Sequence, residues 1–252
     1  MWEDSKIHPI DHATLSALMK NRIPGVRITN FASHKETDNL IDELSEHACR
    51  TNSIKQVTRL GISQYAQGLR VSKENYFTLA KRLNEEFSKI YDQSGFEPVE
   101  RLISKFKEIG FDADVMHEPG MGSYFAGTGK LRNGTSPIHV DFAAQDSDGW
   151  EIAKANVQLA WNLYLRVPEN GGELLLWDKQ WNSEDDIYQV KDNYYYHDDV
   201  VQDAEMLRVK VYPGEVIIIN SRNFHAVSQV DDRLAFGSFI SVFNNKKLRL
   251  WS

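Results

Sequence analysis

The sequence contains a single cysteine, no long apolar run and no excess of positive charge. Cys49 alone cannot form a disulfide within the chain, which suits a reducing compartment. No segment is apolar enough to span a bilayer, and the N-terminus lacks the features of a secretory signal. A net charge of −7 and a pI near 5.6 disfavour nucleic-acid and polybasic membrane surfaces, and mildly disfavour highly anionic substrates. These values still allow a local positive pocket for an anionic co-substrate. We therefore expect a soluble, cytoplasmic protein that binds neither nucleic acid nor membrane.

Helix signals dominate residues 1–110. Residues 33–36 (Ser-His-Lys-Glu) form a capping box, in which the serine and the glutamate satisfy backbone groups at a helix start. Ser72 precedes a long amphipathic segment, and Pro98 stands in the first turn of another. Residues 54–65 fit short strands and a loop equally well. We expect a helix-rich N-terminal support.

From residue 111 onward, short strand-like runs alternate with turn residues. The clearest runs are 113–118, 123–125, 156–167, 172–177, 207–212, 214–220 and 233–243. Asn133-Gly134, a strong hairpin signal, precedes a strand that contains His139. No linker or repeat divides the chain. We predict an α+β protein with a single domain over 1–252, in which a double-stranded β-helix (a jelly-roll, cupin-like core) at 111–252 is backed by the N-terminal helices.

A long polar and aromatic insertion, at about 178–204, separates two of the core strands. It includes the run Tyr194-Tyr195-Tyr196-His197. Long loops of this kind often serve as lids or binding loops, and a decorated surface excursion is an equally good interpretation. In either case, we expect the tyrosine run and His197 to be too mobile to bind a metal directly.

Two residues of the strand near 139 carry the main functional signal. His139 and Asp141 project from the same face, because side chains alternate along a strand. His225 follows the apolar run 214–220 after a short link, and it could bring a second imidazole to the same place. Two histidines and one carboxylate on one side of a metal are the ligand set of mononuclear non-haem Fe(II) oxygenases. Arg233 could hold a carboxylate through a bidentate fork. Each residue alone has an ordinary structural explanation, and their combination predicts a metal site.

The combined pattern resembles the Fe(II)/2-oxoglutarate-dependent oxygenases. More narrowly, it is similar to the branch that contains the carrier-independent indole-alkaloid halogenases of cyanobacteria and their hydroxylating relatives. The segments that carry the resemblance are Ile28-Thr29-Asn30-Phe31, His139-Val140-Asp141-Phe142, 167–174, Trp181-Asn182, 233–239 and Leu250-Trp251-Ser252. The resemblance implies that His139, Asp141 and His225 bind iron and that Arg233 anchors the distal carboxylate of 2-oxoglutarate. It also implies Fe(II), 2-oxoglutarate and O₂ as cofactors.

The sequence departs from the halogenases at Asp141. They have glycine at this position, and the missing carboxylate leaves room for a halide on the metal. With Asp141 present, three protein ligands and a bidentate 2-oxoglutarate leave one position for O₂ and none for chloride. The resemblance therefore implies hydroxylation of an unactivated C–H bond in a small molecule, such as a natural product, an amino acid or a nucleoside, with release of succinate and CO₂. Desaturation, cyclisation or epimerisation, and a non-catalytic cupin-like metal sensor, are the alternatives.

Other residues could assist, and each has a structural alternative. Four side chains on strand-like segments could face the pocket and bind 2-oxoglutarate or substrate: Tyr124, Lys130, Arg132 and Asn156. Asn220 and Arg222 could orient His225 from behind. Trp161 and Trp177 are better explained as packing residues, and His117 and Glu118 should face opposite ways because they are successive strand positions.

Overall fold

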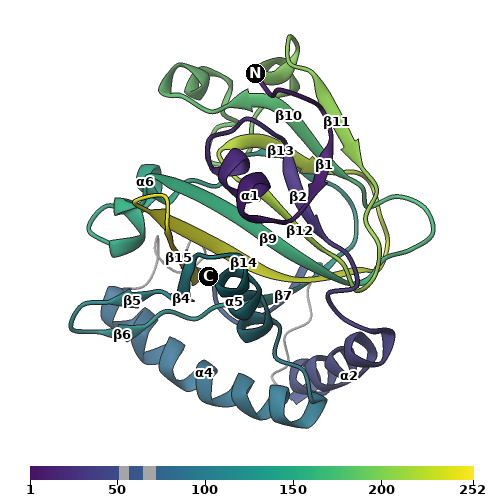
Figure 1. Ribbon diagram of the computed structural model, residues 1–252, viewed down its shortest axis with the longest axis vertical. Coiled ribbons are helices and arrows are strands. Elements are labelled where there is room, and N and C mark those ends of the chain that lie inside the picture. Colours follow the sequence, from purple (N-terminus) through teal and green to yellow (C-terminus); the bar gives the residue numbers. More distant parts are fainter. Residues whose placement is uncertain (51–56, 65–71) are drawn as a thin grey trace.

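The computed structural model describes residues 1–50, 57–64 and 72–252 (Figure 1). Of the segment 54–65, for which the sequence left strand and loop open, residues 54–56 and 65 lie outside the described residues, and the described part, 57–64, begins with the strand β3 (Val57–Leu60). Within the described part of the chain, no helix is both long enough and apolar enough to cross a membrane.

Two facing β-sheets form the core. The larger sheet is built around four neighbouring strands, and the smaller sheet contains four more. In the larger sheet the order is β7 (Thr128–Arg132), β14 (Arg233–Phe243), β9 (Val157–Arg166) and β12 (Val216–Asn220). In the smaller sheet it is β8 (Ser136–His139), β13 (Asn223–Val227), β10 (Leu174–Gln180) and β11 (Met206–Val209). Because the chain alternates between the two sheets, this is the predicted double-stranded β-helix.

Further strands extend the larger sheet at its edges. Beyond β12 lie β2 (Gly25–Ile28) and β1 (Ile7–Pro9), β3 pairs with β7, and β15 (Lys247–Trp251) links β14 to β4 (Asp112–Val115). A separate two-stranded ribbon is formed by β5 (His117–Glu118) and β6 (Gly122–Ser123). The strand β14 is long enough to pair with β7 at its start and with β15 at its end.

The N-terminal helices cover one face of the larger sheet, and the smaller sheet lies on the other (Figure 1). The helices are α1 (His12–Met19), α2 (His34–Arg50), α4 (Lys73–Ser94) and α5 (Pro98–Glu108), followed later by the short α6 (Ala143–Asp146) and the 3₁₀ helix η1 (Glu151–Lys154). Ser72 caps α4 by accepting a hydrogen bond from the Asn75 N–H, and Gly95 ends it in the left-handed region at φ 66°. The sequence signals for these helices are therefore confirmed.

The hairpin expected at Asn133-Gly134 is wrong. The two strands that flank this turn, β7 and β8, belong to different sheets. The turn is bonded to a third segment instead: the Gly134 N–H donates to the Val230 carbonyl at 2.6 Å, and the Asn133 side chain accepts from the Asp232 N–H at 2.7 Å. Because these bonds hold the turn against another loop, it directs the chain across from one sheet to the other.

The insertion after β10 is packed against the protein. It contains the 3₁₀ helices η2 (Ser183–Tyr188) and η3 (Asp198–Val201). The Tyr196 N–H donates to the Ile138 carbonyl at 2.8 Å, and Tyr195 pairs with His139 as an isolated bridge, so the insertion extends the edge of the smaller sheet. The Tyr196 ring is buried and lies 5.2 Å from the Phe224 ring. These contacts hold the tyrosine run in place, contrary to the mobility that we expected.

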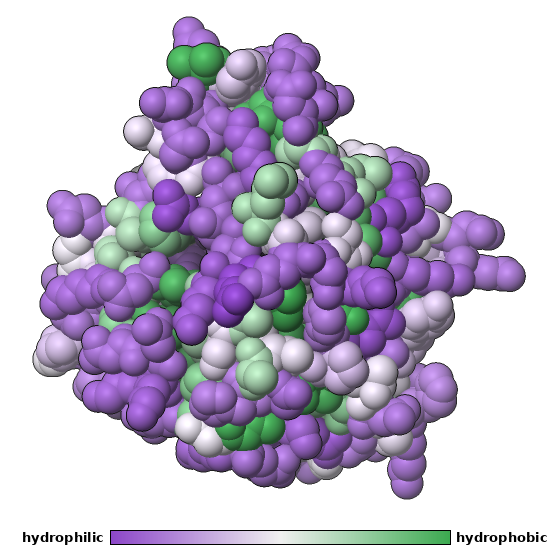
Figure 2. Space-filling view, turned by 45° about the horizontal axis from the view of Figure 1, so that its top comes forward, coloured by the Kyte–Doolittle hydropathy of each residue, from purple (hydrophilic) through white to green (hydrophobic). Residues whose placement is uncertain are grey.

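Figure 2 shows one face of the surface, on which hydrophilic side chains predominate and apolar ones form small, separate patches. The large hydrophobic side chains instead fill the interior, with Trp161 and Phe236 among those that are completely buried between the sheets and the helices. The Trp161 indole donates to the Ser238 hydroxyl at 2.7 Å, so this tryptophan is a packing residue, as predicted.

Candidate metal centre

His139, Asp141 and His225 come together between the two sheets. One ligand atom from each lies within 4.8 Å of the others. His225 on β13 stands opposite His139 on β8 in the strand register, and the two ring centres are 4.2 Å apart. The Asp141 Oδ2 lies 3.4 Å from the His225 Nε2 and 3.9 Å from the His139 Nε2. The neighbouring strands β8 and β13 supply the two imidazole nitrogens. Asp141, which follows β8 directly, supplies a carboxylate oxygen close to both.

The two imidazoles are oriented by the same device. The Nδ1 of His139 is 2.7 Å from the Pro137 carbonyl, and the Nδ1 of His225 is 2.8 Å from the Asn223 carbonyl. If Nδ1–H donates to the carbonyl in each case, the Nε2 lone pair faces Asp141 and is available to a metal. His225 lies within the strand β13. The sequence had suggested only a short link between an apolar strand and this histidine.

The backbone of Asp141 is also fixed. Its N–H donates to the Ser221 carbonyl at 2.9 Å, and the Ser221 hydroxyl donates back to the Asp141 carbonyl at 2.9 Å. Sequence reasoning missed Ser221, which follows β12 and belongs to no motif.

The sequence also suggested that Asn220 and Arg222 orient His225, and this is wrong. The Asn220 side chain accepts a hydrogen bond from the backbone N–H of Arg222, and the Arg222 Nε donates to the Trp181 carbonyl.

The protonation states of the centre suit a metal. Burial, and then the neighbouring His225, lower the pKa of His139 to about 4. Burial alone would raise the pKa of Asp141, but the adjacent His225, the neighbouring His139 and the positive charge of Lys130 lower it to about 2. At neutral pH these values give a neutral imidazole and an ionised carboxylate, which are the forms that bind metals. A donor set of two nitrogens and one carboxylate oxygen on one side is the set that Fe(II) takes in this type of site.

Arg233 lies on the neighbouring wall with an unexpected companion, Tyr164. Both are buried, and the Arg233 guanidinium carbon is 4.9 Å from the centre of the Tyr164 ring. Among the described residues, neither the Arg233 Nε nor the Tyr164 hydroxyl has a hydrogen-bond partner. Because buried polar atoms without a partner are costly, their presence indicates a place for an anionic ligand. Sequence reasoning missed Tyr164. Its only signal was that it lies on a predicted strand, and the pairing of that strand with β14 places its side chain on the same face as Arg233.

The structure gives Tyr124 and Asn156 no place beside Arg233. The Tyr124 hydroxyl donates to the buried Glu118 carboxylate within a cluster of aromatic rings. Asn156 is exposed at the opposite end of β9, about 26 Å along the strand from Tyr164 at roughly 3.3 Å per residue.

The remaining sequence-based expectations fall outside the centre. His117 is exposed while Glu118 is buried, as predicted for successive positions on a strand. Trp177 packs in the smaller apolar cluster on the outer face of the smaller sheet, together with Phe224 and Tyr196.

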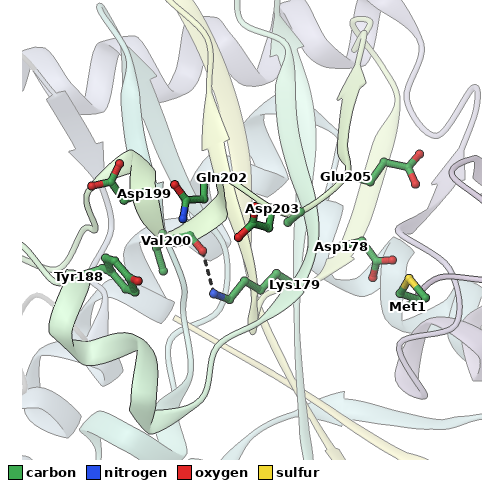
Figure 3. A pocket seen from close by; sticks show the side chains of 10 residues that line it. Met1, Asp178, Lys179, Tyr188, Asp199, Val200, Gln202, Asp203 and Glu205 are labelled. Atoms are coloured by element: carbon green, nitrogen blue, oxygen red, sulfur yellow. Dashed lines mark hydrogen bonds between the residues drawn. The ribbon is translucent and has the colours of Figure 1, made fainter.

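A separate cavity of about 270 Å³ lies where the insertion meets the N-terminus, and it contains none of the three converging residues (Figure 3). Its wall includes Asp178, Asp203 and Glu205. The Lys179 ammonium donates to the Val200 carbonyl at 2.8 Å and pairs with Asp185 at 2.8 Å. This lysine is therefore used within the protein, and the cavity shares no residue with the candidate metal centre.

A double-stranded β-helix in which two histidines and an aspartate converge between the sheets defines the class of Fe(II)/2-oxoglutarate-dependent oxygenases. The chain belongs to the family described as carrier-protein-independent halogenase WelO5, whose model matches residues 7–252. The predicted relationship is thereby confirmed. The cofactors are Fe(II), 2-oxoglutarate and O₂.

Several characterised proteins are similar to this chain. The leucinostatins biosynthesis cluster protein S of Purpureocillium lilacinum is 30% identical over 192 residues, which cover 72% of this chain and 77% of that protein. The L-isoleucine 3(1)-dioxygenase of Pantoea ananatis (strain AJ13355) is 24% identical over 210 residues, which cover 77% and 70%. A solved structure of an N-substituted L-amino acid dioxygenase from Burkholderia ambifaria AMMD, in complex with alpha-KG, has a TM-score of 0.67 at 17% identity and covers 95% of this chain and 90% of its own. This last likeness supports the fold.

Proposed function

We propose that this protein is an Fe(II)/2-oxoglutarate-dependent hydroxylase that acts on an amino acid or a small molecule derived from one. The carrying observation is Asp141, whose carboxylate stands 3.4 Å from the His225 Nε2 where the halogenases of the family have none. The substrate class is supported by the names of two relatives, an L-isoleucine dioxygenase and an L-gamma-glutamyl-L-propargylglycine hydroxylase. The products would be a hydroxylated substrate, succinate and CO₂.

In this proposal His139, Asp141 and His225 would hold the iron, each through one ligand atom. Together with 2-oxoglutarate and O₂, the bound iron supplies the oxidising power for C–H cleavage. Arg233 and Tyr164 hold the distal carboxylate of 2-oxoglutarate, because their buried polar atoms lack other partners among the described residues. Because Asp141 would take the place that a halide has in the halogenases, the hydroxyl product is expected even in the presence of halide.

The test is turnover with Fe(II), ascorbate, 2-oxoglutarate and a panel of free and N-acylated L-amino acids, in buffers with and without chloride and bromide. We expect succinate release that depends on the substrate, and a product heavier by one oxygen atom in all buffers. A product that contains halogen would contradict the hydroxylase assignment, and a product that lacks two hydrogens would indicate desaturation. If the protein binds iron and never consumes 2-oxoglutarate, the whole proposal is wrong.

A further inference from the structure

The loop that leads to Arg233 is tied to two other segments of the chain. This loop, residues 228–232, runs from the end of β13 to the start of β14, whose first residue is Arg233. On one side, the Gly134 N–H donates to the Val230 carbonyl at 2.6 Å. On the other side lies the Gly-Gly-Glu segment 171–173, directly before β10. The proposed function gives this segment no role, although it belongs to the stretch that carries the family resemblance.

The segment 171–173 is bonded to the loop at successive positions. The Ser228 N–H donates to the Glu173 carbonyl at 3.0 Å, and the Glu173 N–H donates to the Ser228 hydroxyl oxygen at 3.0 Å. The Ser228 hydroxyl in turn donates to the Glu173 carboxylate, and the Gly172 N–H donates to the Gln229 carbonyl at 3.3 Å. These bonds set the spacing of the two loops, and so they set the space left for any side chain between them.

Both glycines of the segment have the left-handed backbone, with φ 81° at Gly171 and 72° at Gly172. A Cβ atom on Gly171 would lie 2.2 Å from the Gln229 carbonyl oxygen, so this glycine lets the two backbones meet. A Cβ atom on Gly172 would lie 3.0 Å from the Arg233 Cδ and 3.0 Å from the Val230 Cγ2. Gly172 therefore borders the stem of the arginine, whereas Gly171 borders backbone.

The orientation of Arg233 depends on packing along its stem. The side chain is buried, and its Nε has no hydrogen-bond partner within the part of the chain that the structure describes. Its guanidinium carbon lies 4.9 Å from the centre of the Tyr164 ring, and its Cδ lies beside Gly172. Two further charged groups near Tyr164, Arg27 and Glu215, pair with each other at 2.9 Å. Because a planar guanidinium binds a carboxylate bidentately only in the correct orientation, contacts along the stem decide how well it is held.

We propose that Gly172 is a positioning residue for 2-oxoglutarate. Its missing side chain leaves the space in which the Arg233 stem lies, and the bonds between the two loops keep that space constant. A methyl group at this position would have to displace the stem, and the guanidinium would then turn away from the distal carboxylate. The metal centre would be unaffected. This inference rests on the proposed function, in which Arg233 holds the distal carboxylate, and it gives the Gly-Gly-Glu segment a role in binding the keto acid.

The test compares two keto acids that differ in the distal carboxylate. Protein loaded with Mn(II) in the absence of O₂ is titrated by calorimetry with 2-oxoglutarate and with 2-oxopentanoate, which has the same chain length and no distal carboxylate. The variants are Gly172→Ala, Arg233→Met and, as the matched control, Gly120→Ala. Gly120 has a similar backbone, with φ 77°, and a Cβ atom there would meet nothing within 4 Å. Circular dichroism and the Kd of Mn(II) are measured for each variant.

Gly172→Ala should weaken 2-oxoglutarate about 5- to 30-fold, as for the partial loss of one charged hydrogen-bond pair, and change the Kd of 2-oxopentanoate by less than about twofold. Gly120→Ala should leave both values unchanged, and every variant should keep its affinity for Mn(II). In the double variant Gly172→Ala/Arg233→Met, the alanine should cause no loss beyond that of Arg233→Met alone, because the guanidinium that it displaces is absent.

If Gly172→Ala does not fold, Gly172→Ala/Val230→Ala takes its place and is compared with Val230→Ala alone. The second change removes one of the two close contacts of the added methyl group and keeps the one with Arg233. The expected loss of 2-oxoglutarate affinity is the same, again without a loss for 2-oxopentanoate.

Three results would overturn the role of Gly172: an unchanged Kd of 2-oxoglutarate, an equal loss for both keto acids, or an equal loss in Gly120→Ala. The anchor in the proposed function is tested separately by Arg233→Met, which should weaken 2-oxoglutarate and leave 2-oxopentanoate unchanged. If Arg233→Met does so and Gly172→Ala does not, only the role of Gly172 is wrong. If Arg233→Met leaves both keto acids unchanged, the anchor is wrong and the role of Gly172 falls with it.

Discussion

At the scale of single residues, Asp141 distinguishes the proposed reaction from halogenation. Its backbone is fixed by the two hydrogen bonds to Ser221, and its carboxylate lies 3.4 Å from the His225 Nε2. Under the proposed function this carboxylate would take the position that a halide occupies in the halogenases, so its removal should change the chemistry of the centre.

Asp141→Gly should lower hydroxylation by at least about 100-fold, because two imidazoles alone hold a divalent metal weakly and leave its coordination incomplete. The measurement is hydroxylated product per unit time, with Mn(II) affinity followed in parallel by electron paramagnetic resonance. Asp148→Gly, at an exposed position of the loop that follows, is the control and should keep wild-type values. Full hydroxylation in Asp141→Gly would show that this carboxylate is not a ligand.

At the scale of the elements, Glu36 joins two helices that support the larger sheet. Its carboxylate accepts from the Ser33 N–H at 2.8 Å at the start of α2, and it pairs with Arg101 of α5. The hydrogen bond from Arg101 is the main reason that the pKa of Glu36 falls to about 2 from its ordinary 4.5. The ionised form is thus favoured in the folded state, and the carboxylate stabilises the fold wherever it remains charged.

Glu36→Gln should lower the free energy of unfolding by about 1 kcal/mol near pH 7, the usual size of a lost cap with a partly exposed ion pair. Because the pKa is lower in the folded than in the unfolded state, the contribution is complete above about pH 4.5 and is lost as the pH falls toward about 2. Urea unfolding of both proteins from pH 7 to pH 2.5 measures the difference, which should narrow across that range. Glu85→Gln, on an exposed position of α4, is the control. A difference that stays constant with pH would contradict the assignment.

The insertion is a second element with a testable attachment. Tyr196 is buried against Phe224, whereas Tyr194 in the same run is 58% exposed and lies edge-on to the His139 ring. Tyr196→Ala should lower the free energy of unfolding by roughly 3 kcal/mol, because it leaves a cavity in the smaller apolar cluster. Tyr194→Ala should change it by less than about 0.5 kcal/mol. Urea unfolding decides, and equal effects of the two changes would show that the insertion is not anchored through Tyr196.

At the scale of the whole molecule, the sequence predicted the features that depend on nearby residues and missed those that depend on contacts between distant segments. Ser72 caps α4 through a bond to Asn75, three residues on, and His139 and Asp141 are only two residues apart at the end of β8, so the sequence predicted both. Tyr164 joins the site only because β9 pairs with β14, and no short motif reports that pairing. The hairpin prediction at Asn133-Gly134 was wrong for the same reason, because the hydrogen-bond partners of this turn, Val230 and Asp232, are about a hundred residues away.

The two sheets each supply half of the proposed ligand site. His139 and His225 belong to the smaller sheet, and Arg233 to the larger, so a metal and a keto acid bound together would connect them. Mn(II) at a hundred times its Kd should raise the free energy of unfolding by about 2.7 kcal/mol, and 2-oxoglutarate at a hundred times its own Kd should add a similar increment. Both are measured by urea unfolding without O₂.

Arg233→Met separates the two increments. This change removes the guanidinium from the larger sheet and leaves the three residues of the metal centre intact, so the variant should keep the stabilisation by Mn(II). It should lose most of the further increment at the same 2-oxoglutarate concentration, because one bidentate charge pair accounts for a large part of the affinity for a small dianion. Arg249→Met, at a partly exposed position of β15, is the matched control and should keep both. If Arg233→Met retains the full 2-oxoglutarate increment, the keto acid is held elsewhere, and the larger sheet takes no part in binding it.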